Sequence, residues 1–138
     1  MKRTLVLIAL CSIGLGACGD DTIEPVVETL DLAFTGLAPL ANGYHYEGWA
    51  IVDGAAVSTG KFNVDGTGAL VTVSGAAIMG GSFETGLDLM DATKIVLTIE
   101  PSGDTDAMPS DTHILAGDVS GSSATLIAAD GAALGADF

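Results

Sequence analysis

Three aspartates lie close together in a polar segment, and their carboxylates are of the kind that binds hard cations. Asp104, Asp106 and Asp111 fall within the segment Pro101–Thr112, and Glu100 comes directly before it. Carboxylate oxygens at short spacing suit Ca²⁺. The spacing lacks the glycine and the closing bidentate glutamate of an EF-hand, so a solvated acidic loop is the alternative. Calcium bound by these three aspartates is therefore a hypothesis from ligand type alone.

A second group of residues with binding chemistry is aromatic. Tyr44, Tyr46 and Trp49 stand close together in a chain that is only 5% aromatic. If exposed, they would form a stacking surface for a glycan or a protein partner. In a strand, alternation puts the two tyrosines on one face and Trp49 on the other, with His45 and Glu47. One face must then be buried, and we expect Trp49 to lie in the core.

The sequence offers little for catalysis. Nucleophilic catalysis needs a serine, cysteine or threonine beside a positioned base, and His45 and His113 are the two histidines of the chain. No Gly-x-Ser-x-Gly motif is present. Asp104 and Asp106 would suit acid and base catalysis only if different surroundings separated their pKa values. We therefore expect no enzyme, and a hydrolase that uses acidic residues is the lower alternative.

Charge limits the choice of partners. The chain has 18 aspartates and glutamates, and Lys61 and Lys94 are the only lysines or arginines after residue 17. Nucleic-acid binding requires lysines and arginines that neutralise phosphates, so we exclude nucleic acid as a partner. Strong negative charge favours cations or neutral molecules.

The N-terminus has the pattern of an export signal. Lys2 and Arg3 precede an apolar stretch, Thr4–Ala17, that is shorter than the roughly 20 residues of a membrane-spanning helix. The tetrapeptide Leu15–Cys18 resembles the lipobox of bacterial lipoproteins, in which the cysteine receives diacylglycerol and becomes the mature N-terminus. We therefore predict that residues 1–17 are a lipoprotein signal peptide and that Cys18 is lipidated.

Lipidation would place the protein at the cell envelope, outside the cytoplasm. The membrane is then one partner, held through the acyl chains on Cys18. Gly19 after the cysteine favours the outer membrane or the cell surface over the inner membrane. Residues 18–28 form a short acidic tether. No disulfide is expected, since Cys11 leaves with the signal peptide and Cys18 carries the lipid.

The rest of the chain, residues 29–138, reads as short strands separated by turn residues. Leu30, Leu32 and Phe34 alternate with polar or small residues, and Asp53-Gly54 is a two-residue hairpin signal. Leu87, Leu89 and Met90 suggest at most one short helix near 85–93. We predict an all-β domain, an antiparallel β-sandwich of immunoglobulin-like architecture, from apolar runs at 30–35, 44–52, 55–58, 60–64, 69–73, 78–83, 94–100, 113–119 and 124–128.

A family resemblance rests on several short motifs. They are Tyr46–Val52, the turn Asp53-Gly54, the return Gly60–Phe62, and the strand Val96–Pro101, followed by Asp104, Pro109 and Leu115. Together they resemble the extracytoplasmic C-terminal domain of the anti-sigma-K factor (RskA-type) family over roughly Leu30 to Leu126. The resemblance implies a β-sandwich that senses or binds outside the membrane.

The resemblance does not extend to sigma-factor inhibition. That activity needs a cytoplasmic helical domain and a transmembrane helix, for which we expect no room in this chain. Family members also continue into one more strand, so the comparison implies that a C-terminal strand is missing here. We expect a non-enzymatic, lipid-anchored binding or sensing module; a calcium- or glycan-binding surface protein is the alternative.

Overall fold

The computed structural model describes residues 29–128, so the predicted signal peptide, Cys18, the tether and any closing C-terminal strand lie outside the described residues. Within that range the chain is all-β, which confirms the predicted class. Its elements are β1 (Thr29–Asp31), β2 (His45–Val52), β3 (Ala55–Val64), β4 (Leu70–Val71), the 3₁₀ turn η1 (Met79–Gly81), β5 (Ser82–Glu84), β6 (Ala92–Glu100), β7 (His113–Ser120), β8 (Ser123–Ala124) and β9 (Ile127–Ala128).

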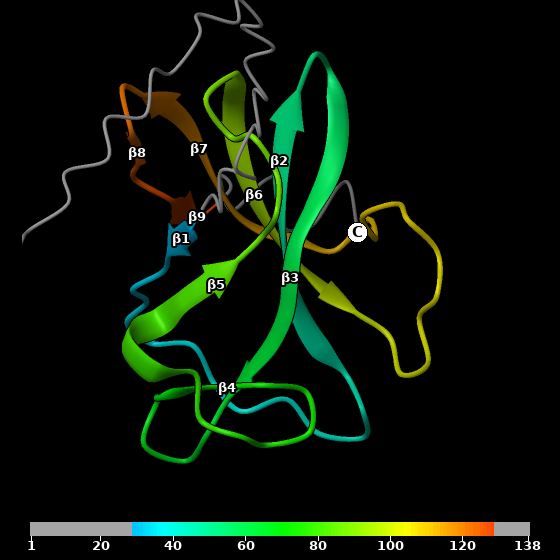
Figure 1. The fold of residues 1–138 in the computed structure, drawn as a ribbon. Helices are drawn as coiled ribbons and strands as arrows, with labels where there is room; N and C mark the ends of the chain where they lie inside the picture. Colours follow the sequence, from blue (N-terminus) through cyan, green and yellow to red (C-terminus); the bar gives the residue numbers. More distant parts are fainter. Residues whose placement is uncertain (1–28, 129–138) are drawn as a thin grey trace, which may run out of the picture.

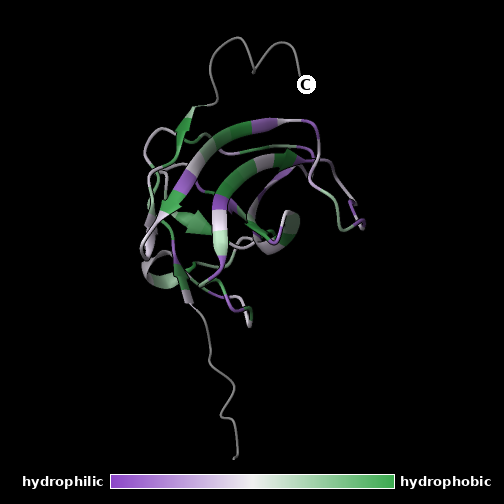
Figure 2. Cartoon of the chain, turned by 90° about the horizontal axis from the view of Figure 1, so that it is seen from above, coloured by the Kyte–Doolittle hydropathy of each residue, from purple (hydrophilic) through white to green (hydrophobic). Residues whose placement is uncertain are grey.

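Two antiparallel sheets make up the domain. The larger has the order β4-β3-β2-β6-β7-β8, with β9 also pairing with β7, and the smaller consists of β1 and β5. The large sheet is curled into a half-barrel, and its strands arch around one side of the molecule when seen from above (Figure 2). In Figure 1, β5 lies beside β3. Phe83 of β5 packs against Phe62 of β3, so the small sheet covers the face of the large sheet that carries Phe62.

Phe62 of β3 is the centre of the main core. It is fully buried and stacks on Phe34 and Tyr46, with ring centroids 5.7 Å and 5.5 Å away. Phe83 of β5 approaches it from the small sheet, at 5.6 Å. Aromatic pairs at such distances add to the stabilisation from buried area. Phe62 thus joins β2, β3, β5 and the segment after β1 into one core.

The β2–β3 hairpin forms as its sequence predicts. Asp53 and Gly54 both have positive φ, 52° and 78°, the conformation that a two-residue type I′ turn requires and that Asp-Gly favours. β3 then runs without a break through residues 55–64, where the sequence suggested two separate strands. A bulge at Thr59 explains the difference: Gly48 pairs with Gly60 and Trp49 with Ser58, which leaves Thr59 as the extra residue.

The short helix that the sequence allowed near residues 85–93 is not formed. Residues 85–91 are loop and turn, and β6 begins at Ala92. The Met90 amide donates to Asp88 Oδ1 and the Ala92 amide to the Leu89 carbonyl, so local turns satisfy the backbone. No helix in residues 29–128 is long and apolar enough to cross a membrane.

Candidate functional site

The central strand β2 carries a buried polar face. His45, Glu47 and Trp49 alternate along it, and their exposed fractions are 4%, 2% and 1%. Tyr46 and Ala50, on the opposite face, are buried as well. Both faces of this strand are therefore buried, where alternation required only one, and Trp49 lies in the core as predicted.

Glu47 is held by two residues of β3. Ser58 donates its hydroxyl proton to Glu47 Oε1, and Lys61 Nζ lies 3.3 Å from Glu47 Oε2. Residues 58 and 61 would face opposite sides of a regular strand, because side chains alternate with period two. The extra residue Thr59 in the bulge brings both side chains to the same face. The bulge is therefore what assembles this part of the site.

The loop between β6 and β7, residues 101–112, adds a second carboxylate. Asp104 Oδ2 accepts a hydrogen bond from Lys61 Nζ at 3.0 Å, and the Asp104 carbonyl accepts one at 3.3 Å. The Lys61 bond is the main reason that the pKa of Asp104 lies below its usual value. Burial lowers the pKa of Lys61, but the bond to Asp104 and the charge of Glu47 outweigh it and the pKa is raised. Both groups are thereby held in their charged forms.

A hydrogen-bond network continues along β6 from this cluster. Trp49 Nε1 donates to Thr98 Oγ1 at 2.9 Å, and the Thr98 hydroxyl is within hydrogen-bonding distance of Glu100 Oε1. Glu100 is buried, and the same oxygen accepts the Ser110 amide at 3.0 Å. Ser110 also donates its hydroxyl to the Ile99 carbonyl. These bonds fix the far end of the 101–112 loop against the sheet.

His45, Glu47 and Asp104 form the one group of three potential metal ligands that residues 29–128 bring together. A ring nitrogen of His45 and a carboxylate oxygen from each of the other two residues all lie within 4.8 Å of one another. His45 Nδ1 is 3.4 Å from the Gly43 carbonyl. Its Nε2 atom is buried and has no hydrogen-bond partner.

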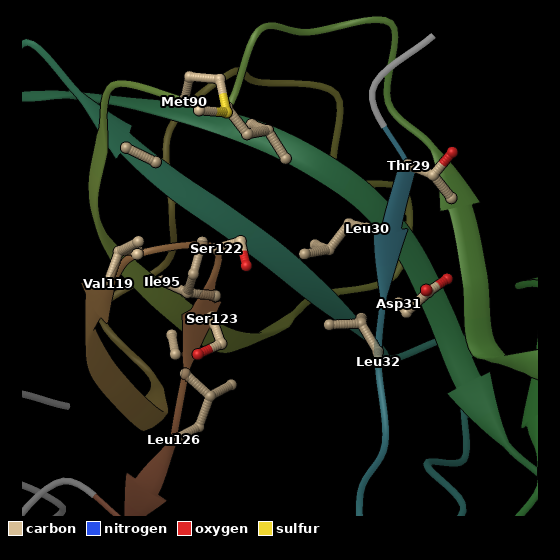
Figure 3. A pocket seen from close by; sticks show the side chains of 14 residues that line it. Thr29, Leu30, Asp31, Leu32, Met90, Ile95, Val119, Ser122, Ser123 and Leu126 are labelled. Carbon is tan, nitrogen blue, oxygen red and sulfur yellow. The ribbon is translucent and has the colours of Figure 1, made fainter.

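A separate pocket of about 330 Å³ lies between β1 and the β7–β8 end of the large sheet. Leu30 and Leu32 point into it from one side, and Ile95, Val119 and Leu126 lie on the other (Figure 3). Its polar groups include the hydroxyls of Ser122 and Ser123, and Met90, 76% exposed, stands at its edge. Thr29 and Asp31 point away from it (Figure 3), as the alternation in β1 predicts.

The residues named from the sequence as binding groups do not all lie together in the structure. Tyr44 is 47% exposed, whereas Tyr46 and Trp49 are buried on opposite faces of β2, so the three share no surface. Asp104 faces Lys61, while Asp106 and Asp111 are exposed and belong to no ligand group in residues 29–128. Calcium binding itself remains a prediction.

Sequence reasoning did not identify Lys61 or Glu47 as site residues. The signal that would have pointed to them is the polar pair His45 and Glu47 at positions i and i+2 of a strongly β-forming run. Polar side chains on one face of a central strand must find partners there. Lys61 is one of the two lysines in residues 29–128, so it was a candidate to pair with the charge of Glu47.

Comparison of the chain with models of known protein families, with curated proteins and with solved structures finds no match.

Proposed function

We propose that this protein is a lipid-anchored, non-enzymatic binding or sensing module of the bacterial envelope. The lipobox Leu15–Cys18 supports the anchor, and the resemblance to the anti-sigma-K factor outer domain supports the role. The observation that carries the binding function is the pocket between β1 and β7–β8. Its volume of about 330 Å³ falls in the range of roughly 300–1,000 Å³ typical of small-molecule sites.

The lining of the pocket limits the ligand. Leu30, Leu32, Ile95 and Val119 offer apolar contacts, and Ser122 offers a hydroxyl near the rim. Apolar walls with few polar groups select a mainly apolar molecule and fix its orientation. The chain has a formal net charge of −14, which disfavours anions. The ligand is therefore a small, neutral or cationic molecule that is apolar over most of its surface.

The position of the pocket in the chain fits a site close to a membrane. β1, which forms one wall, begins at Thr29, directly after the proposed tether. Residues 19–28 reach no further than about 35 Å even when fully extended, at roughly 3.5 Å per residue. Lipid on Cys18 would thus keep the pocket near the bilayer surface, where apolar molecules concentrate.

The anchor is tested by Cys18→Ser. We expect the variant to remain unlipidated and to leave the membrane fraction, because acyl chains on this cysteine supply the membrane affinity. The measurement is fractionation of cells with and without detergent, together with mass spectrometry of the mature N-terminus. Cys11→Ser is the matched control and should stay in the membrane fraction. Detergent-dependent membrane association of Cys18→Ser would refute the anchor.

The pocket is tested by filling it from its rim. We expect the neutral apolar dye N-phenyl-1-naphthylamine to fluoresce on binding the wild-type protein, and Ser122→Trp to weaken binding at least tenfold by occupying the volume. Val73→Trp is the control, since Val73 is 53% exposed and does not line the pocket. Both variants should unfold at the wild-type temperature. Equal dye affinity in wild type and Ser122→Trp would show that the dye binds elsewhere.

A further inference from the structure

We propose that His45, Glu47 and Asp104 bind a divalent transition-metal ion of the zinc class, and that Lys61 competes with the metal for the two carboxylates. This site is separate from the apolar pocket and does not rest on the binding function proposed there. It also differs from the calcium hypothesis, because it replaces Asp106 and Asp111 with a histidine and a glutamate from β2.

The geometry brings the three ligands almost into coordinating distance. Their ligand atoms lie within 4.8 Å of one another. Around a tetrahedral ion with bonds of roughly 2.0–2.1 Å, ligand atoms are about 3.3 Å apart. The ligands must therefore close by at most about 1.5 Å. Asp104 belongs to the 101–112 loop, so that closure needs movement of a loop and of side chains but no rearrangement of the sheet.

Two buried atoms of the cluster have no hydrogen-bond partner. They are His45 Nε2 and Glu47 Oε2, on side chains that are 4% and 2% exposed. Lys61 Nζ lies 3.3 Å from Glu47 Oε2 and forms an ion pair with it, but not a hydrogen bond of good geometry. Buried polar atoms are nearly always satisfied in folded proteins. A metal ion would supply the missing partner to both atoms at once.

Formal charge points in the same direction. The connected polar region contains three carboxylates, Glu47, Glu100 and Asp104, against the single ammonium of Lys61. Its formal charge is therefore −2 with His45 neutral. Buried charge is costly unless it is paired, and a divalent cation would neutralise this region completely. Neutral imidazole is also the form of histidine that binds metals.

The surroundings orient the ligands as metal sites usually do. A histidine ligand commonly donates its second ring N–H to a carbonyl or carboxylate, which fixes the tautomer. His45 Nδ1 lies 3.4 Å from the Gly43 carbonyl, which leaves Nε2 for the metal. Glu47 is fixed in the same way, because Ser58 donates to Oε1 and Oε2 stays available. Each strand ligand thus has one atom held by a hydrogen bond and one atom without a hydrogen-bond partner.

The donor set identifies the class of metal. Calcium takes six to eight oxygen ligands, whereas one imidazole and two carboxylates suit Zn²⁺, with a water molecule as the fourth ligand. Bound metal would tie the 101–112 loop to β2 through Asp104. Lys61 is 33% exposed and can swing toward solvent when the metal takes its place.

Metal binding is tested with the full-length lipoprotein, purified in detergent and stripped with a chelator. We expect Zn²⁺ to bind in a 1:1 ratio by calorimetry and to raise the melting temperature, because a ligand of the folded state stabilises it by mass action. Co²⁺ should give the visible absorption of a tetrahedral site. His45→Gln should weaken Zn²⁺ binding at least 100-fold. His113→Gln, which alters an exposed histidine outside the cluster, should not change it.

Lys61→Met distinguishes the metal site from a purely structural ion pair. Removal of a competing cation should tighten Zn²⁺ binding, and Zn²⁺ should restore the stability that the variant loses. If Lys61 has only a structural role, the variant is destabilised and Zn²⁺ restores nothing. No 1:1 Zn²⁺ binding to wild type, equal binding by His45→Gln, or a loss of binding in Lys61→Met would each overturn the proposal. If His45→Gln does not fold, the Zn²⁺ affinity of Lys61→Met and the Co²⁺ absorption spectrum of the wild-type protein test the proposal instead.

Discussion

Trp49→Ala is expected to lower the free energy of unfolding by about 4 kcal/mol, as truncation of large core aromatics typically does. Trp49 is 1% exposed and lies on the central strand of the large sheet. Its Nε1 atom donates to Thr98 Oγ1 at 2.9 Å in a buried position, so the substitution removes both a large side chain and a buried hydrogen bond. A loss of this size is a large share of the roughly 5–15 kcal/mol that stabilises most domains.

Urea unfolding followed by circular dichroism measures this effect, since Trp49 is the only tryptophan and its fluorescence is lost with it. Trp49→Phe keeps most of the apolar volume but not the N–H group, so it should fall between wild type and Trp49→Ala. Tyr44→Ala is the control on the same stretch and should cost less than 1 kcal/mol because Tyr44 is 47% exposed. A loss below 1 kcal/mol in Trp49→Ala would show that the two faces of β2 are not both packed.

Gly81→Ala is expected to destabilise the domain by about 3 kcal/mol, from two separate causes. Gly81 has φ +71°, and an L-residue in this left-handed conformation costs roughly 1–2 kcal/mol. A Cβ at this position would also lie 2.2 Å from the Leu32 carbonyl oxygen. The resulting backbone shift adds roughly 1–3 kcal/mol. The Leu32 amide donates to the Gly81 carbonyl at 2.8 Å. The clash would therefore push apart the segments next to β1 and β5, the two strands of the small sheet.

Gly80→Ala provides a closely matched control for the steric part. Gly80 has φ +68°, yet a Cβ there would meet no atom within 4 Å. It should therefore show the conformational cost alone, about 1–2 kcal/mol. Both variants are compared by urea unfolding. If they lose the same stability, the close approach of Gly81 to β1 does not contribute.

The sequence was a good guide to the strands and a poorer one to their faces. Period-two alternation predicted β6 and the direction of Leu30 and Leu32, and Asp53-Gly54 predicted the hairpin turn, whereas β1 ends at Asp31 although the alternation continues to residue 35. Alternation describes one strand at a time, however. It does not show that Lys61 of β3 and the 101–112 loop, which is more than 40 residues from β2 in sequence, lie against the face of β2 that carries Glu47.

The candidate site shows the same limit at the level of single residues. From the sequence, Asp104 was grouped with Asp106 and Asp111, which are close to it in the chain, whereas in the structure its carboxylate lies beside Lys61 and within 4.8 Å of ligand atoms of His45 and Glu47. Its actual partner Lys61 is 43 positions away. The bulge at Thr59 that brings Lys61 and Ser58 to Glu47 coincides with the interruption that the sequence shows between residues 58 and 60, but the interruption does not reveal which side chains then share a face.

The pairing of β2 with both β3 and β6 combines a local contact with a long-range one, and the two are expected to form at different rates. β2 and β3 are joined by a two-residue turn, and isolated hairpins form within roughly 1–10 μs. β6 pairs on the other edge of β2, with Trp49 and Thr98 bonded across 49 positions. Long-range pairing of this kind is slow, because the chain loses the entropy of closing a large loop before the stabilising contacts between the strands can form. Until β6 docks, one edge of β2 has unpaired backbone groups, and an open strand edge of this kind is where a folding domain is most exposed to pairing with another chain.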